Sequence, residues 1–472
     1  MEHLTVSLFE HSLSTGSSPD DQRELLEQSL SRLFATQGAV EFWEYRREQH
    51  TLLEQTFSSA EAFRLTHMYP LSYFHFTSLI ILISFVNQGH SWSKLQVSSE
   101  LLLQILAHHR ISSFLIDFVH CFGDKVTGDD NPYYGTFHAA FSLPNDGKSL
   151  QLNQNYEFCC HLRRFERHDN RQLKDPWSLR QMTAYQRYDF DSEKSTWVLI
   201  KAFQGCKSRL RTVISKGRPK HPMALHLLFL TMATENWRWY IDCLRRRLAE
   251  FTEKATFSCV EQTRADYDIK FADSQRLHTL ESKLIIAIAV LEENIDIGEG
   301  MKRHCNRLER TEKTKIYKKI KEVIICDLEV QIAHLHLHRR AAELLICQLR
   351  GTCTLLLKVL DYRNDLIMKD YSKIANELAG IANAQNTSLK VLARETKRDS
   401  RLVKVLTVIA IAYLPANLIA AIFSSGLVRT SDQDFHGSSF HISRDFWIYL
   451  LTSIAVTIVT VSTAFWWDRR GY

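Results

Sequence analysis

One short stretch has the residue types that hold a nucleotide phosphate. Gly147-Lys148-Ser149 matches the end of a P-loop, in which backbone amides and a lysine bind phosphate oxygens. That motif also requires a glycine five residues before Gly147, and the chain has Ser142 there. Asn145-Asp146-Gly147 lies between two strand-like runs, where these residue types favour a hairpin turn. We therefore expect a turn at this position and no phosphate site.

Three alternating histidines, His334, His336 and His338, have the chemistry of metal ligands. On a helix only His334 and His338 share a face, and no third Cys, Asp or Glu completes a ligand set nearby. We expect solvated histidines beside a leucine seam. The soluble part shows no nucleophile motif, zinc spacing or dinucleotide fingerprint, so we expect neither an enzyme nor a bound cofactor.

The most informative polar residues lie inside an apolar stretch. From Val405 to Phe423 the chain has no charged residue, and only Thr407, Tyr413 and Asn417 are polar. A helix of about 20 residues crosses the hydrocarbon core of a membrane. An amide facing lipid is disfavoured, so Asn417 should face a partner helix or a water-filled pore. Pro415 removes one helical hydrogen bond in the middle of this span.

A second apolar stretch, Phe446 to Trp467, predicts a second span. Its small and hydroxyl residues should form faces on which another helix can pack closely: Ser453, Thr457, Thr460 and Thr463. Basic residues precede the first span and follow the second: Lys397, Arg398, Arg401, Lys404, Arg469 and Arg470. The positive-inside rule then places both termini in the cytosol and the loop Ser424 to Asp445 outside. In this topology the sequon at Asn386 is cytosolic and unmodified.

Composition agrees with a membrane protein that has a large cytosolic part. The 472 residues carry a formal net charge of +6, which suits the anionic cytoplasmic membrane surface. There is no Lys/Arg tract of the kind that binds nucleic acid. Ten cysteines occur, none in a C-x-x-C pair, so we expect reduced thiols. The plasma membrane is the favoured location.

Periodicity predicts the elements that carry these residues. Residues 1 to about 120 look helical and mixed, with a buried strand or helix at Thr77 to Val86. Tyr133 to Phe203 has short runs rich in aromatic and β-branched residues, which predict a small sheet. Met223 to Phe251 is predicted to be one long helix.

Two heptad series follow in a region that has no proline between residues 265 and 400. The first series is apolar: Leu328, Ile332, Leu335, Arg339, Ala342, Ile346, Leu349, Cys353, Leu356 and Leu360. The second becomes polar toward the membrane: Ile374, Leu378, Ile381, Gln385, Ser388, Leu392, Glu395, Asp399, Leu402 and Leu406. Polar seam positions indicate a wet interface, such as a vestibule. A loosely packed two-helix stalk is the alternative.

A heptad stalk that runs through a basic collar into an apolar span resembles the CorA-type magnesium transporter family. The segments that carry the resemblance are Thr396–Ser425, Asp175–Phe190 and His221–Leu248, and they look like a divergent fungal branch of that family. The resemblance implies an α+β cytosolic domain, a long helical stalk and two C-terminal transmembrane helices. The implied boundaries are 1–260 for the cytosolic domain, 261–402 for the stalk, 403–427 for the first span, 428–445 for the external loop, 446–467 for the second span and 468–472 for a basic cytosolic tail.

The resemblance also implies a homopentamer that carries divalent cations, with Mg²⁺ as the expected ion, through a central pore lined by the first span. The pore face carried over from the family consists of Ser400, Val403, Leu406, Leu414 and Asn417. Hydrophobic constrictions at the valine and leucines would gate by dewetting, and Asn417 would form a polar ring. Regulatory ions could bind acidic residues such as Asp268, Asp273 and Glu281, among which the sequence gives no basis for choice.

One departure from the family affects the selectivity of the pore. The family ends its first span with Gly-Met-Asn, and this chain has Ser424-Ser425-Gly426 there. Hydroxyl and carbonyl oxygens at this mouth could bind a hydrated cation with less geometric precision. Asp432 and Asp434 in the loop could add weak electrostatic attraction. Two functions are therefore compatible with the sequence: divalent cation transport, or a non-conducting membrane-anchored scaffold or regulator.

Overall fold

The structure is a computed structural model, and it describes residues 19–46, 51–68, 79–125, 137–142, 155–168, 175–190, 192–216, 221–258, 269–308, 315–424 and 444–470. The chain divides into two compact units, Met1–Arg363 and Asn364–Tyr472. One helix belongs to both units, because α10 extends without a break from Lys315 to Ser424.

The first unit is built on a seven-stranded sheet with the order β2-β1-β3-β7-β6-β5-β4. The strands are β1 (Val40–Arg46), β2 (Thr51–Phe57), β3 (Leu79–Val86), β4 (Phe137–Ser142), β5 (Asn155–Arg167), β6 (Trp177–Asp189) and β7 (Ser195–Ile200). Strand β3 pairs with β7 in parallel, and the other neighbours are antiparallel. The predicted sheet is confirmed, and of the two alternatives for Thr77 to Val86 the structure has the strand, β3. The N-terminal region predicted as helical and mixed also contains β1 and β2, which were not predicted.

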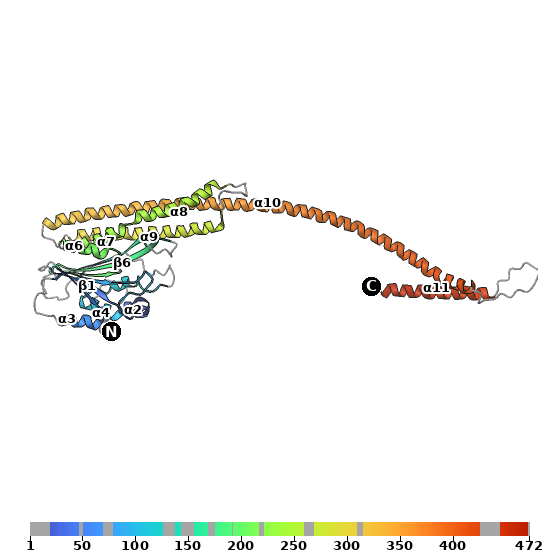
Figure 1. The fold of residues 1–472 in the computed structure, drawn as a ribbon, viewed down its shortest axis with the longest axis horizontal. Coiled ribbons are helices and arrows are strands. Elements are labelled where there is room, and N and C mark those ends of the chain that lie inside the picture. The colour runs from blue at the N-terminus through green and yellow to red at the C-terminus, as the bar shows by residue number, and fades with distance from the viewer. Residues whose placement is uncertain are drawn as a thin grey trace, which may run out of the picture. The chain divides into compact units, whose positions relative to one another are not determined.

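Helices cover both faces of the sheet, which gives the unit three layers (Figure 1). The helices of one layer are α2 (Pro19–Leu33), α3 (Ala60–Met68), α4 (Ser99–His108) and α5 (Leu115–Val119). Those of the other layer are α6 (Cys206–Ser215), α7 (Ala224–Thr234), α8 (Trp237–Phe257), α9 (Phe271–Leu308) and the first half of α10. A separate hydrophobic core lies on each face of the sheet.

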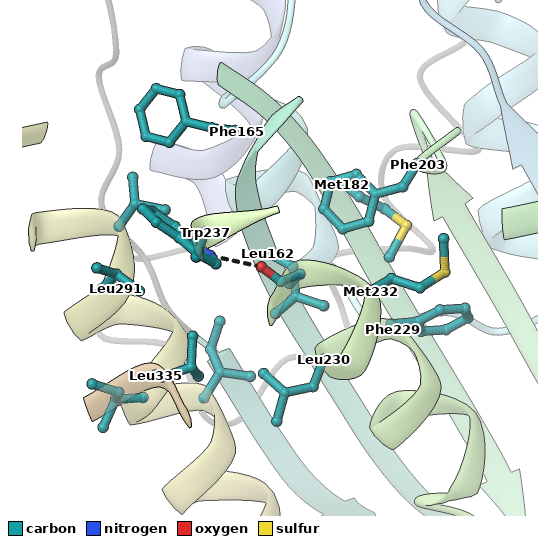
Figure 2. Close-up of a cluster of buried hydrophobic side chains, with 14 of the residues drawn as sticks. Leu162, Phe165, Met182, Phe203, Phe229, Leu230, Met232, Trp237, Leu291 and Leu335 are labelled. Atoms are coloured by element: carbon teal, nitrogen blue, oxygen red, sulfur yellow. Dashed lines mark hydrogen bonds between the residues drawn. The ribbon is translucent and has the colours of Figure 1, made fainter. Parts of the chain in front are cut away.

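Strand β5 contributes side chains to both hydrophobic cores. Tyr156, Phe158 and Cys160 belong to the core shared with α7, α8, α9 and α10, while Cys159 belongs to the opposite core. Successive side chains of a strand point to opposite faces, so a nearly unbroken apolar run fits a strand buried on both sides. In Figure 2 side chains of the sheet meet Trp237, Leu291 and others from the helices.

The helix predicted over Met223 to Phe251 is two helices, and the single-helix prediction is wrong. Helix α7 ends at Thr234 and α8 begins at Trp237. Asn236 between them has φ of +69°, a left-handed conformation that asparagine tolerates better than most residues. The indole Nε1 of Trp237 donates to the carbonyl oxygen of Ala233 at 2.9 Å, across the break. Apolar periodicity continues through this short turn and therefore does not show it.

The first predicted heptad seam is confirmed as the buried side of α10. Leu328, Leu335, Ala342 and Leu356 are fully buried, in the same core as residues of α8 and α9. The seam therefore packs within one chain, against the helices that cover the sheet.

The phosphate-loop fragment lies outside the described residues, as do all residues from 143 to 154. The strands on either side of it do pair in antiparallel fashion, with Ser142 opposite Asn155. That pairing fits the predicted hairpin connection between β4 and β5.

The second unit contains the C-terminal half of α10 and helix α11 (Arg444–Arg470). Helix α10 contains a segment long and apolar enough to cross a membrane, with a mean hydropathy of 2.0 over its best window. Helix α11 contains a shorter apolar stretch, Leu450–Thr463, among the described residues. The predicted boundary between stalk and first span, at residues 402 and 403, lies inside the unbroken α10.

Candidate functional site

The five residues of the predicted pore face all lie on α10, and all five are exposed in the single chain. Their spacings place them on one side of the helix. Val403 and Leu414 are eleven residues apart, as are Leu406 and Asn417, and eleven residues make three turns. Ser400 precedes Val403 by three residues, on the neighbouring turn. The helix therefore presents them as one continuous face.

The opposite side of α10 is covered. Pro415 and Ile419, four residues apart, are buried, while Leu414 and Asn417 are exposed. Ile411, which is eleven residues from Ser400 and so borders the pore face, is half-buried. Asn417 is two residues from both Pro415 and Ile419, which on a helix is about 200° around the axis. Asn417 thus points away from the covered side. In an apolar span an exposed amide without a covering helix requires water or another chain.

Helix α11 supplies a matching face. Leu450, Ser453, Thr457 and Thr460 are its half-buried residues among those whose side chains are described. In Figure 1, α11 runs back along the C-terminal part of α10 within the second unit. We infer that these residues pack against Ile411, Pro415 and Ile419. The prediction of a packing face at Ser453, Thr457 and Thr460 is supported, whereas Thr463 is exposed.

Threonine hydroxyl groups of α11 donate to carbonyl oxygens of their own helix. Thr457 Oγ1 donates to the carbonyl oxygen of Ser453 at 2.6 Å, and Thr463 Oγ1 to that of Val459 at 2.9 Å. Thr407 in α10 donates to the carbonyl oxygen of Val403 in the same way, also at 2.6 Å. Such hydrogen bonds let a threonine side chain lie in an apolar environment without an unsatisfied hydroxyl group.

The mouth of the predicted pore is only partly described. Ser424 is the last residue of α10 and is exposed. Ser425, Gly426, Asp432 and Asp434 lie outside the described residues, so their predicted roles remain predictions.

The acidic residues considered for regulation are engaged in contacts of the first unit. Asp273 is buried, accepts the Lys270 amide at 3.1 Å and lies 3.7 Å from Lys254 Nζ, at the start of α9. Glu281 accepts from Arg350 Nε at 2.9 Å. Asp268 lies outside the described residues. Asp273 therefore acts as a cap for α9, and Glu281 ties α9 to α10.

The three histidines of α10 differ in exposure. His334 is exposed, while His336 and His338 are half-buried. Burial, and then the neighbouring His334, hold the pKa of His338 below its usual value. In the part of the chain that the structure describes, no group of three or more His, Cys, Asp or Glu residues is placed to hold a metal ion.

Sequence reasoning missed the covered face of α10, because Ile411, Pro415 and Ile419 are as apolar as their neighbours. The available signal was helical spacing, which is four residues from Ile411 to Pro415 to Ile419 and alternates between three and four residues through the packing face of α11.

Comparison with known proteins gives a family match. The family model for CorA-like transporters matches residues 8–256. Among solved structures, that of the full-length CmaX protein is 13% identical with a TM-score of 0.38, covering 92% of this chain and 97% of that one. The complete CorA magnesium transporter from Methanocaldococcus jannaschii is 12% identical with a TM-score of 0.34, covering 91% and 98%. The ZntB cytoplasmic domain from Vibrio parahaemolyticus is 10% identical with a TM-score of 0.34, covering 70% and 99%. No curated protein matches the chain.

Proposed function

The chain belongs to the CorA-like transporters, whose family model matches more than half of it, and we propose that it carries Mg²⁺ through a central pore formed by a homo-oligomer. The family transports divalent cations and is not a family of enzymes, so no catalytic step is proposed. The pore would be lined by the exposed face of α10, and α11 would lie at the periphery.

One observation carries this proposal: Asn417 is exposed on the side of α10 opposite to the covered residues Pro415 and Ile419. If α11 covers one side of the span, the amide on the other side faces either lipid or a space shared with other copies. Exposure of the Asn417 amide to lipid is unfavourable. A ring of Asn417 amides around a pore would offer carbonyl oxygens to the water shell of the ion.

Mg²⁺ suits such a ring because it loses its bound water reluctantly. A hydrated ion can be held through its waters by amide and hydroxyl oxygens. Val403, Leu406 and Leu414 on the same face would form apolar constrictions that close when they lose water. The membrane potential would drive the ion inward, at about 2.3 kcal/mol per elementary charge for each 100 mV.

Exposed apolar residues on α10 support the oligomer. In the first unit Val323, Val330, Leu337 and Leu344 recur every seven residues and are all exposed, away from the buried seam. We call these four residues the outer stripe. In the second unit the seam residues Ile374, Leu378 and Ile381 are also exposed. A regular heptad stripe left open to water is typical of a helix that packs against other chains. Five copies are what the resemblance to CorA-type transporters implies.

We propose that both termini lie in the cytosol and that the plasma membrane holds the protein. The basic residues before α10 enters the span and at the end of α11 support this orientation. Glycan attached to Asn386 would contradict it.

The test is cation flux into liposomes that contain the purified full-length protein and a Mg²⁺-sensitive dye. The proposal expects uptake that rises with an inside-negative potential. Asn417→Leu should reduce uptake at least tenfold, and Asn386→Leu, which makes the same change outside the span, should leave it within twofold. Absence of Mg²⁺ uptake by inserted protein would contradict the proposal and favour the non-conducting scaffold.

A further inference from the structure

A stripe of positive charge leads into the apolar span along α10. Its residues recur at alternating spacings of four and three: Lys390, Arg394, Lys397, Arg401 and Lys404. All five are exposed. Alternation of four and three residues keeps side chains on one face of a helix. We call this set the basic stripe.

The sequence offers the basic stripe no acidic partner at the spacing of a helical ion pair. No member has an aspartate or glutamate three or four residues away, the spacing at which helical ion pairs form. In the described part of the chain, Lys390, Arg394, Lys397 and Arg401 form no ion pair. The acidic residues of this segment, Glu395 and Asp399, belong instead to the seam that continues into the proposed pore face. The basic stripe and these two acidic residues thus lie on different sides of α10, and Arg398, three residues from Glu395, lies between them.

The basic stripe points away from the proposed pore. Continued by the same spacing, it runs through Val408 to Ile411 and Pro415, which lie on the covered side of α10. Asn417 lies on the opposite side. A partner of the basic stripe is therefore an anion at the periphery of the assembly and not a cation in the pore.

The distance to the apolar span limits what this anion is. Along the helix axis Arg401 and Lys397 lie about 6 and 12 Å from Val405, at about 1.5 Å per residue. The earlier members of the stripe, Arg394 and Lys390, lie about 17 and 23 Å from the same residue. Phospholipid headgroups lie beside the apolar span, close to Arg401 and Lys397. Because electrostatic attraction decays over a Debye length of about 8 Å, Arg394 and Lys390 should attract the headgroups much less.

We propose that the basic stripe, through Lys397, Arg401 and Lys404, binds the headgroups of anionic phospholipids in the leaflet that α10 enters. This inference rests on the proposed insertion of α10 into a membrane. Long basic side chains near a helix end reach the headgroup region while their stems stay on apolar surface. Clusters of Lys and Arg next to a span bind anionic lipid in this way.

The chain contains a matched control for the test. Lys390 and Arg394 precede Lys397 and Arg401 by seven residues, so they have the same charges on the same face, one heptad farther from the span. The full-length protein in neutral detergent would be titrated with equal amounts of phosphatidylserine and phosphatidylcholine, and retained lipids would be counted by native mass spectrometry. The variants are Lys397→Gln with Arg401→Gln, and Lys390→Gln with Arg394→Gln.

The proposal expects the wild type to retain phosphatidylserine over phosphatidylcholine. The Lys397/Arg401 variant should lose about tenfold in this preference, since each basic residue near the surface adds attraction. The Lys390/Arg394 variant should lose less than twofold, and 0.5 M NaCl should bring the wild type to the level of the first variant.

Equal loss in both variants, or no preference in the wild type, would overturn the proposal. Displacement of phosphatidylserine by 10 mM inorganic phosphate would also overturn it, because it would indicate a simple anion site. Carbonate extraction of cell membranes separates this failure from failure of the proposed function. Protein that resists extraction but shows no lipid preference contradicts only the lipid site, whereas extracted protein contradicts membrane insertion itself.

Discussion

Arg163 of strand β5 and Glu293 of helix α9 form a two-pronged ion pair, with Arg163 Nε 2.8 Å from Glu293 Oε2 and a second contact between Nη2 and Oε1. Both side chains are nearly removed from water, at 6% and 13% exposure. Asn294 beside them donates to the Arg163 carbonyl oxygen at 2.7 Å. The pair therefore fixes α9 against the sheet.

Arg163→Met should destabilise the first unit by about 3–5 kcal/mol, because it leaves a buried carboxylate without a partner. Burial already raises the pKa of Glu293, and the Arg163 guanidinium opposes that rise. Urea unfolding followed by tryptophan fluorescence measures the cost. The control is Arg245→Met, which breaks an exposed pair with Asp242 and should leave the free energy of unfolding nearly unchanged. Equal costs would contradict this role of the buried pair.

The first unit should lose stability as the pH falls below about 6.5. Burial lowers the pKa of His226 from 6.5 to about 3, and burial lowers that of His161 to about 3 as well. A folded-state pKa below the unfolded one means that stability is complete above the unfolded pKa and declines as pH falls toward the folded pKa. At pH 5 the contribution of each histidine to the free energy of unfolding should be about 2 kcal/mol smaller than at neutral pH.

Urea unfolding at pH 7.5 and pH 5 measures this loss. His226 Nε2 lies 3.1 Å from Gln186 Oε1, and His226→Gln keeps a donor there while removing the titration. The variant should lose less stability than the wild type between the two pH values. An unchanged difference would show that His226 does not contribute to the acid sensitivity.

Gly300→Ala should destabilise the first unit by about 1–3 kcal/mol through overpacking. A Cβ at residue 300 would lie 2.4 Å from ring carbons of Phe137, because α9 approaches β4 closely there. Gly351 on α10 is the control, since a Cβ there meets nothing within 4 Å. Gly351→Ala should stabilise the helix by about 0.5–1 kcal/mol. Thermal unfolding of the two variants should therefore shift in opposite directions, and shifts of the same sign would contradict this account.

Val403→Ser should raise cation flux severalfold, because a hydroxyl on the pore face favours water in a constriction that is otherwise apolar. Val408→Ser makes the same change on the other side of α10. The two valines are 61% and 62% exposed in the single chain, so exposure alone does not distinguish them. Liposome uptake should change for the first variant only. An equal response from both would contradict the assigned pore face.

Leu337→Glu together with Leu344→Glu should dissociate the oligomer, since it places charge in the outer stripe. Leu25 on α2 is an exposed leucine in the opposite helical layer, and Leu25→Glu should leave the assembly intact. Mass photometry in detergent reports the change. An unchanged oligomer in the double variant would show that the outer stripe is not an interface.

Local pattern predicted the elements with strong periodicity. The aromatic and β-branched runs from Tyr133 to Phe203 are strands, and the apolar heptad from Leu328 to Leu360 is the buried side of α10. Strand β1 was not predicted, because charged Glu41, Glu44 and Arg46 interrupt its apolar residues. Those charged residues are half-buried, and Glu41 accepts from the Trp43 indole at 2.7 Å and forms an ion pair with Lys207 of α6. The parallel pairing of β3 with β7 joins segments more than 100 residues apart, which no local pattern reveals.

The site was predictable in part. Helical spacing alone places Val403, Leu414 and Asn417 on one face, and all three lie on the unbroken helix α10. The covering of Pro415 by a second helix depends on tertiary packing. The family resemblance was carried by Thr396–Ser425 and by two upstream segments, Asp175–Phe190 and His221–Leu248. The family model matches residues 8–256, which include both upstream segments but not Asn417. The membership thus rests on the N-terminal half of the chain, and the departure at Ser424 lies outside the residues that the family model matches.

Pro415 has a mechanical consequence for the end of α10. Without an amide hydrogen it leaves the Ile411 carbonyl oxygen without its usual helical partner, so the helix lacks one rung there. Pro415 and Ile411 both lie on the side that α11 is inferred to cover. Helix α11 is therefore inferred to pack against α10 at the point where α10 lacks a hydrogen bond. Tilting of residues 416–424 must compress or open the inferred contact with α11, so α11 limits how far the end of α10 can bend.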